Sequence, residues 1–267
     1  MQVLPEVVNK IVSLYFELMD KHLPGLMEGF YIYGSAALND FYPDKSDIDF
    51  ITVVSRKPGH IDVEKLQMVH GLIRMKFRKS ELNGIYVLLE QLGKTKDETE
   101  PVTYYYNSRI HDEGYFEIND VTWYQLKNKA ITLKGTPASE LNFHIDWKCV
   151  LKEMHENMNT YWKRWIKKSS GFSYGSLKVL LFSKCIEWGV LGITRQYYSF
   201  IENDITSKSS AGEWVLTKVP VEYHKILQEA LNIRSGKNYH YTSKYKRKKD
   251  ALAYMRFIIE ESNRRLK

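Results

Sequence analysis

The spacing of apolar residues predicts strands and helices in the first part of the chain. Between residues 5 and 22 apolar side chains recur every three or four positions, which predicts an amphipathic helix with Pro5 in its first turn. Residues 61–77 show the same spacing and are expected to form a second helix. Short apolar runs before and after the sequence GSAALNDFYPDKSD, and again in ELNGIYVLLEQLG, predict three strands.

Weaker patterns follow these strands. Residues 95–119 have no sustained period and are expected to form loops with a short hairpin around 111–114. Residues 123–129 are helix-like, and 130–134 predict a short closing strand. The sequence Gly135-Thr136-Pro137 then marks a domain boundary.

Beyond this boundary the periodicity is helical throughout. Helices are predicted at 146–168, 174–198, 207–219, 221–231 and 246–265. The expected fold class is therefore α+β, with a mixed sheet and flanking helices in residues 1–137 and an α-helical bundle in residues 138–267.

Composition narrows the class of protein without deciding its activity. The 267 residues are 43% hydrophobic, which suffices for one large or two modest cores. No signal peptide and no apolar run of about 18 residues is present, so we expect a cytoplasmic protein with no membrane partner. The two cysteines, Cys149 and Cys185, have spacings that indicate neither a disulfide framework nor a zinc site. The net charge of +7 is dispersed and no nucleic-acid-binding motif accompanies it, so nucleic acid is not an expected partner.

The chemistry-bearing residues gather in residues 30–54, FYIYGSAALNDFYPDKSDIDFITVV. Strand alternation points Asp47 and Asp49 to the same side. Two adjacent carboxylates repel unless a cation lies between them, and such hard oxygen ligands suit a magnesium ion that also takes phosphate oxygens. Gly34 and Ser35 follow the first strand and offer a close backbone approach and a hydroxyl to a phosphate. Taken separately, the two aspartates also fit solvated strand caps and the Gly-Ser pair an ordinary turn.

Joined at this spacing, the motifs resemble a known signature. Gly-Ser, eleven residues and then Asp-x-Asp is similar to the signature of the nucleotidyltransferase superfamily related to DNA polymerase beta. With the later segment TRQYYSFIENDITSKSSAGEWVLTKVP (194–220), the chain resembles the aminoglycoside adenylyltransferases of the streptomycin/spectinomycin resistance type. The resemblance implies a nucleotidyltransferase domain at 1–137, a substrate- and nucleotide-clamping bundle at 138–267, Mg²⁺, ATP as co-substrate and a monomer. It also implies that Arg195 and Lys208 reach the ATP phosphates.

Simpler interpretations of these two cations stay open. Arg195 lies among apolar residues and also fits an internal ion pair with Glu187 or Glu213. Lys208 stands at a predicted helix start and also fits an exposed lysine.

The sequence departs from the family at the general base. The family uses a glutamate on the third strand to deprotonate the substrate hydroxyl, and the matching position here is Asn83, which cannot accept that proton. Glu81, two residues earlier on the same face of the predicted strand, is the substitute that we assign, and it also fits an exposed glutamate at the strand edge. The family's drug-binding aspartates and tryptophan have no recognisable counterparts, and the available candidates for a cationic drug are Glu187, Trp188, Asp112 and Glu113.

The sequence thus predicts a transferase that moves AMP from ATP to a hydroxyl of a small molecule, with an aminoglycoside-type antibiotic as the first choice. Asp47, Asp49 and Glu81 are its predicted catalytic residues, with Asp47 and Asp49 on the metal and Gly34, Ser35, Arg195 and Lys208 on the nucleotide. Three rivals stay open: the same fold acting on a protein or nucleic acid, a silent ATP-binding regulator, and, last, a basic nucleic-acid-binding module.

Overall fold

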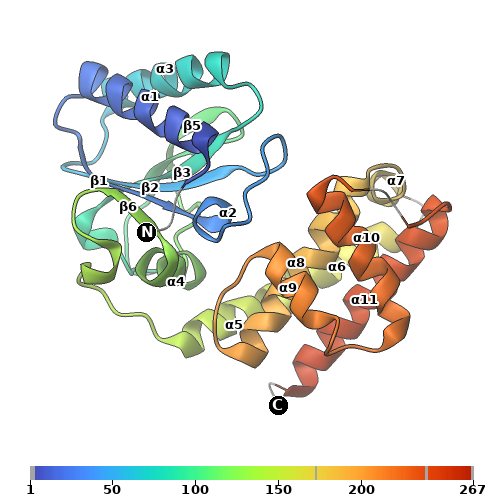
Figure 1. Ribbon diagram of the computed structural model, residues 1–267. Coiled ribbons are helices and arrows are strands. Elements are labelled where there is room, and N and C mark those ends of the chain that lie inside the picture. Colours follow the sequence, from blue (N-terminus) through green and yellow to red (C-terminus); the bar gives the residue numbers. More distant parts are fainter. Residues whose placement is uncertain (1–3, 172, 238–239, 266–267) are drawn as a thin grey trace. The chain divides into compact units, whose positions relative to one another are not determined.

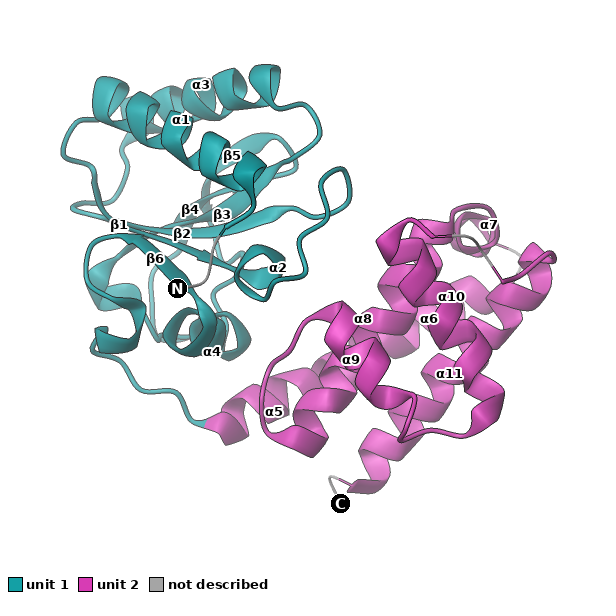
Figure 2. Ribbon diagram, in the orientation of Figure 1, with its two compact units in different colours: residues 1–146 teal, residues 147–267 magenta. Residues whose placement is uncertain are grey.

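The computed structural model describes residues 4–171, 173–237 and 240–265. The chain divides into two compact units, residues 1–146 and 147–267 (Figure 2). This division falls nine residues after the Pro137 that ends the predicted first domain. The predicted α+β fold, a mixed sheet with flanking helices followed by a helical bundle, is confirmed.

A six-stranded mixed sheet forms the centre of the first unit. Its strands lie in the order β5-β4-β3-β2-β1-β6. Their bounds are β1 Met27–Tyr33, β2 Ile48–Val54, β3 Leu82–Leu88, β4 Val102–Tyr106, β5 Arg109–Gly114 and β6 Ile131–Lys134. Neighbours are antiparallel except β2 and β3, which run parallel because helix α3 connects them. The motif strands β1 and β2 are therefore interior strands of the sheet.

Helices cover both faces of this sheet. Helices α1 (Glu6–His22) and α3 (His60–Lys76) lie on one face, and α4 (Asp120–Lys129) lies on the other (Figure 1). The short elements are α2 (Gly34–Ala37), η1 (Leu89–Gln91) and η2 (Ala138–Glu140). The sheet is thus buried on both sides, which explains the nearly unbroken apolar runs of its interior strands.

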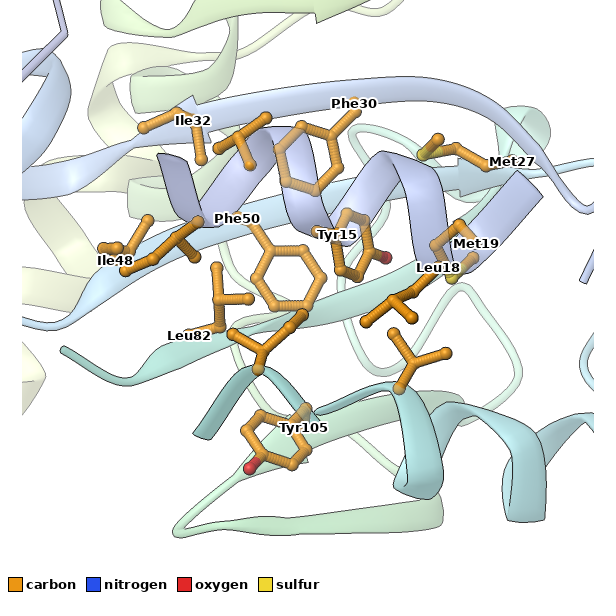
Figure 3. Packing of buried hydrophobic residues seen from close by; sticks show 14 of the residues in the cluster. Tyr15, Leu18, Met19, Met27, Phe30, Ile32, Ile48, Phe50, Leu82 and Tyr105 are labelled. Atoms are coloured by element: carbon orange, nitrogen blue, oxygen red, sulfur yellow. The ribbon is translucent and has the colours of Figure 1, made fainter. Parts of the chain in front are cut away.

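The core under α1 and α3 shows how strand alternation positions the site. Ile48 and Phe50 of β2 are fully buried there, and Phe50 stacks on Phe30 with ring centroids 5.6 Å apart (Figure 3). Tyr15 of α1 packs against both rings and donates a hydrogen bond to the Tyr86 hydroxyl at 3.2 Å. Because successive residues of β2 face opposite sides, burying Ile48 and Phe50 here directs Asp49 to the α4 side of the sheet.

The second unit is helical. Its elements are α5 Trp147–Asn157, η3 Met158–Trp162, α6 Lys163–Ser170, α7 Tyr174–Leu181, α8 Ser183–Glu202, α9 Lys208–Val215, η4 Val221–Tyr223, α10 His224–Ser235 and α11 Lys244–Arg265. The predicted helix over 174–198 is two helices, which separate at Phe182. The predicted helix over 146–168 contains a π-helical turn at Met158–Trp162. Within the described ranges, every helix is too short or too polar to cross a membrane.

Candidate active site

The structure brings the glycine turn and the second aspartate of the motif into direct contact. Tyr33, the last residue of β1, is the register partner of Asp49 on β2. Gly34 follows with φ +64°, a conformation that side chains other than glycine rarely adopt. A Cβ built on Gly34 would lie 2.0 Å from Asp49 Oδ2. The turn therefore requires glycine both for its backbone conformation and for the space that the Asp49 carboxylate occupies.

Ser35 and Asp47 lie at the open side of the same corner. The Ser35 hydroxyl donates to the backbone oxygen of Asp47 at 3.4 Å, which ties the turn to the residues preceding β2. Asp47 is exposed and Asp49 is half-buried, whereas Ile48 between them is fully buried. The four residues that the motif singled out thus lie around one corner of the sheet: Gly34, Ser35, Asp47 and Asp49.

Asn83 lies beside this corner on the neighbouring strand. It is the parallel register partner of Asp49, and its neighbours Ile85 and Val87 face the α4 side. The Asn83 side chain is 7% exposed, and its Oδ1 has no hydrogen-bond partner among the described residues. A buried carbonyl oxygen without a donor carries a desolvation cost, which a ligand at this position would offset.

Glu81, the predicted base, precedes β3 rather than lying within it. Its carboxylate accepts a hydrogen bond from the Ser108 hydroxyl at 2.7 Å, in the turn between β4 and β5. It also acts on Tyr105, whose pKa is raised by burial first and then by the Glu81 charge. The Tyr105 ring stacks on the imidazole of His70 in α3, with ring centroids 3.7 Å apart. The structure therefore joins the Glu81 side chain to Ser108 and Tyr105, while the Glu81 backbone oxygen accepts a hydrogen bond from the Ile48 N–H at 2.8 Å, between Asp47 and Asp49.

Sequence reasoning missed two groups at this corner, Tyr33 and Glu117. The Tyr33 side chain is buried. Its pKa is raised well above the ordinary value, first by burial and then by the negative charges of Glu117 and Asp49. Glu117 has φ +57° and accepts a hydrogen bond from the Thr122 hydroxyl at 2.5 Å. Glu117 lies in the aperiodic stretch before α4, so only the fold shows that its charge, like that of Asp49, acts on Tyr33.

The two predicted phosphate-binding cations belong to the second unit. Lys208 begins α9, and its ammonium lies 3.5 Å from Glu187 Oε1 on α8. Its side chain is 21% exposed, so the prediction of an exposed lysine is not what the structure shows. Arg195 of α8 is half-buried and lies close enough to lower the pKa of Lys208. Glu187 pairs with Lys208 and with Arg234.

The first-unit corner fits a divalent cation that carries a nucleotide. No group of three or more His, Cys, Asp or Glu side chains placed to hold a metal occurs within the part of the chain that the structure describes. Two carboxylates and a neutral oxygen such as that of Asn83 nevertheless suit magnesium, which keeps several waters and takes phosphate oxygens as its other ligands.

In the first unit the glycine turn packs against the Asp-x-Asp strand of a mixed sheet, and a helical unit follows in the chain. Residues 186–260 match the family model described as "Aminoglycoside adenylyltransferase, C-terminal domain". The chain is 26% identical over 240 residues to a spectinomycin 9-adenylyltransferase of Campylobacter jejuni, an alignment that covers 85% of this chain and 83% of that protein.

A solved structure has the same fold. It is a spectinomycin adenyltransferase of Enterococcus faecialis crystallised with ATP and spectinomycin, with a TM-score of 0.66 and 18% identity over 94% of this chain and 99% of that one. Together these findings confirm the resemblance to the aminoglycoside adenylyltransferases and class the chain as an enzyme, a nucleotidyltransferase.

Proposed function

We propose that this protein is a magnesium-dependent adenylyltransferase that moves AMP from ATP to a hydroxyl of an aminoglycoside-type antibiotic, with spectinomycin the first acceptor to test. The observation that carries the proposal is the contact between Gly34 and Asp49, because a residue with a Cβ cannot occupy that turn while the carboxylate stays in place. The names of the similar proteins support the acceptor class and the use of ATP.

The proposed reaction is an in-line displacement at the α-phosphorus. The oxygen of the acceptor hydroxyl forms a bond to the α-phosphorus, the bond to the bridging oxygen breaks, and pyrophosphate leaves with that electron pair. Magnesium, when bound, neutralises charge on the phosphates. Asp47 and Asp49 hold that ion, and Gly34 and Ser35 bind a phosphate by backbone N–H and hydroxyl.

Arg195 and Lys208 are proposed to bind the leaving phosphates. Pyrophosphate gains charge as it departs, and fixed cations stabilise that charge more than water does. The burial of Lys208 supports this role, since a largely buried ammonium with one carboxylate at 3.5 Å retains donors for an anion.

Glu81 is the proposed base from the sequence, and the Ser108 contact makes it the assignment to test first. A carboxylate in that position accepts the proton of the acceptor hydroxyl only if it leaves Ser108. A Glu81→Gln variant should lose turnover at unchanged ATP affinity if Glu81 is the base. Unchanged turnover would remove Glu81 from the mechanism.

The activity is tested by mixing protein, ATP, magnesium and a panel of aminoglycosides that includes spectinomycin, and following pyrophosphate release. Asp47→Asn should abolish release. Asp44→Asn is the matched control, because Asp44 lies in the same loop but pairs with Lys79 at 3.0 Å on the surface. Equal rates for Asp47→Asn and the wild type would refute the metal assignment.

A second candidate function is favoured by Asn83, whose amide cannot act as a base. Under this alternative the protein binds ATP and magnesium without transferring AMP to a drug, either because its acceptor is a macromolecule or because it is a regulator. Calorimetric ATP binding with no pyrophosphate release on any drug would favour this alternative. Release on addition of cell extract would then separate a macromolecular acceptor from a regulator.

A further inference from the structure

A buried carboxylate in the second unit is shared by two cations from different helices. Glu187 of α8 lies 3.0 Å from the Arg234 guanidinium of α10 and 3.5 Å from the Lys208 ammonium of α9. Glu187 is 6% exposed and Arg234 is 5% exposed, so this pair is inside the helical core. Lys208 is partly accessible, at the edge of the same cluster.

Lys208 lies in surroundings that disfavour its positive charge. Burial is the largest effect and lowers its pKa, and Arg195 and Arg234 lower it further. Glu187 opposes them, by its charge and by its hydrogen bond. The start of a helix is also unfavourable for a cation, because backbone N–H groups point toward it there. Glu187 is therefore the one carboxylate, among the described groups that act on Lys208, that raises the pKa of this lysine.

We propose that Glu187 is a positioning residue for nucleotide binding, which holds the Lys208 ammonium in place and charged so that its remaining donors face a phosphate. This inference rests on the proposed function for the phosphate role of Lys208. Arg234 and Lys208 contact the same carboxylate oxygen, Oε1 of Glu187, with Arg234 on the buried side and Lys208 at the accessible edge. The ammonium has three donors, and its contact to Glu187 uses one of them.

The same unit offers a matched pair that has no lysine. Glu229 of α10 is fully buried and lies 3.4 Å from Arg247 of α11, which is 4% exposed. Both pairs are buried arginine–glutamate contacts between helices, and breaking either leaves a buried arginine without that carboxylate. Glu229→Gln therefore reproduces the structural loss of Glu187→Gln without touching Lys208.

The first measurement needs no nucleotide. The pKa of Lys208 is followed by NMR of its side-chain carbon next to the ammonium, assigned with Lys208→Arg, in the wild type, Glu187→Gln and Glu229→Gln. Glu187→Gln should lower the pKa of Lys208 and Glu229→Gln should leave it unchanged. An unchanged pKa in Glu187→Gln would overturn the proposal. Where Glu187→Gln does not fold, Glu187→Asp, which keeps the charge but shortens the side chain, is measured instead and should lower the pKa to a smaller extent.

The second measurement is the affinity for ATP-magnesium between pH 7 and 10, over which the triphosphate keeps its charge. In Glu187→Gln the Kd should rise about tenfold for each pH unit above the lowered pKa, because only the protonated lysine binds phosphate. Adding Lys208→Arg to Glu187→Gln should abolish this pH dependence, since arginine stays protonated. A pH dependence that survives in the double variant would overturn the proposal.

The two measurements separate this proposal from the proposed function. If Glu187→Gln lowers the pKa of Lys208 but the wild type does not bind ATP, the nucleotide-binding role of Lys208 is refuted. The proposal that Glu187 positions Lys208 for a nucleotide is then refuted with it. Wild-type ATP binding with an unchanged pKa in Glu187→Gln would leave the proposed function standing and refute the inference about Glu187.

Discussion

Replacing Gly34 by alanine tests the contact on which the proposed function depends. The new Cβ would lie 2.0 Å from Asp49 Oδ2 and 2.9 Å from its Cγ. Restoring a separation of 3.0 Å requires a movement of about 1 Å, and because the aspartate side chain is short, its carboxylate must rotate away from the corner. A displacement of about 1 Å at a catalytic group costs about 100-fold in rate. We therefore expect turnover to fall about 100-fold.

Gly25 supplies the matched control. It has φ +74°, close to the +64° of Gly34, but a Cβ there meets nothing within 4 Å. Both alanine variants should lose about 1–2 kcal/mol of unfolding free energy from the left-handed backbone alone. Only Gly34→Ala should also displace the Asp49 carboxylate.

Urea unfolding measures the stability of both variants, and pyrophosphate release measures their turnover. The prediction is a similar loss of stability and a loss of activity confined to Gly34→Ala. Wild-type turnover in Gly34→Ala would show that the position of the Asp49 carboxylate against the turn is not needed, and the site described here would then be wrong. Equal losses of turnover in both variants would assign the effect to backbone strain.

Two further predictions concern a buried histidine and the empty base position. Burial lowers the pKa of His70 to about 3, and its Nε2 lies 2.6 Å from the Tyr86 hydroxyl. The unfolded chain binds the proton near pH 6.5, so unfolding free energy should fall by about 1.4 kcal/mol per pH unit as pH drops below 6.5, until the folded pKa is reached. His70→Phe should reduce this slope in denaturant titrations, and an unchanged slope would contradict the assignment. Asn83→Glu places a carboxylate beside Asp49 and should raise pyrophosphate release at least tenfold, since general bases contribute about 10²–10⁴-fold. A rate that stays level or falls would show that a base is not lacking there.

The sequence predicted the motif corner because all of its determinants are local. The spacing of Gly34, Asp47 and Asp49 is linear, and strand alternation fixed which side the aspartates face, as the burial of Ile48 and Phe50 shows. The hairpin after β3 was placed too late, around 111–114. Its turn is Asn107-Ser108, where both residues have positive φ, a geometry that non-glycine residues adopt rarely and that composition alone did not indicate.

In the second unit, the sequence predicted the apolar helical segments better than it predicted the points at which those helices are interrupted. Periodicity over 174–198 does not register the interruption at Phe182, because apolar residues continue through it and the side chain there is exposed at 58%. Periodicity likewise does not separate a π-helical turn from an α-helix, since Met158 and Trp162 are buried on both interpretations.

The charged residues show most clearly where sequence reasoning ends. An ion-pair partner is chosen by which helices pack together, so the sequence did not indicate that Glu187 contacts Lys208 of α9 and Arg234 of α10. Glu81 was assigned by strand alternation, yet it precedes β3 and bonds to Ser108, twenty-seven positions later in the chain. In both cases the carboxylate contacts a residue on another element, and no periodicity in the sequence indicates that the two elements meet. A carboxylate already engaged in this way must give up a hydrogen bond before it can act on a substrate, so the base of this reaction has to be found by substituting Glu81 and Asn83, not by extending the motif.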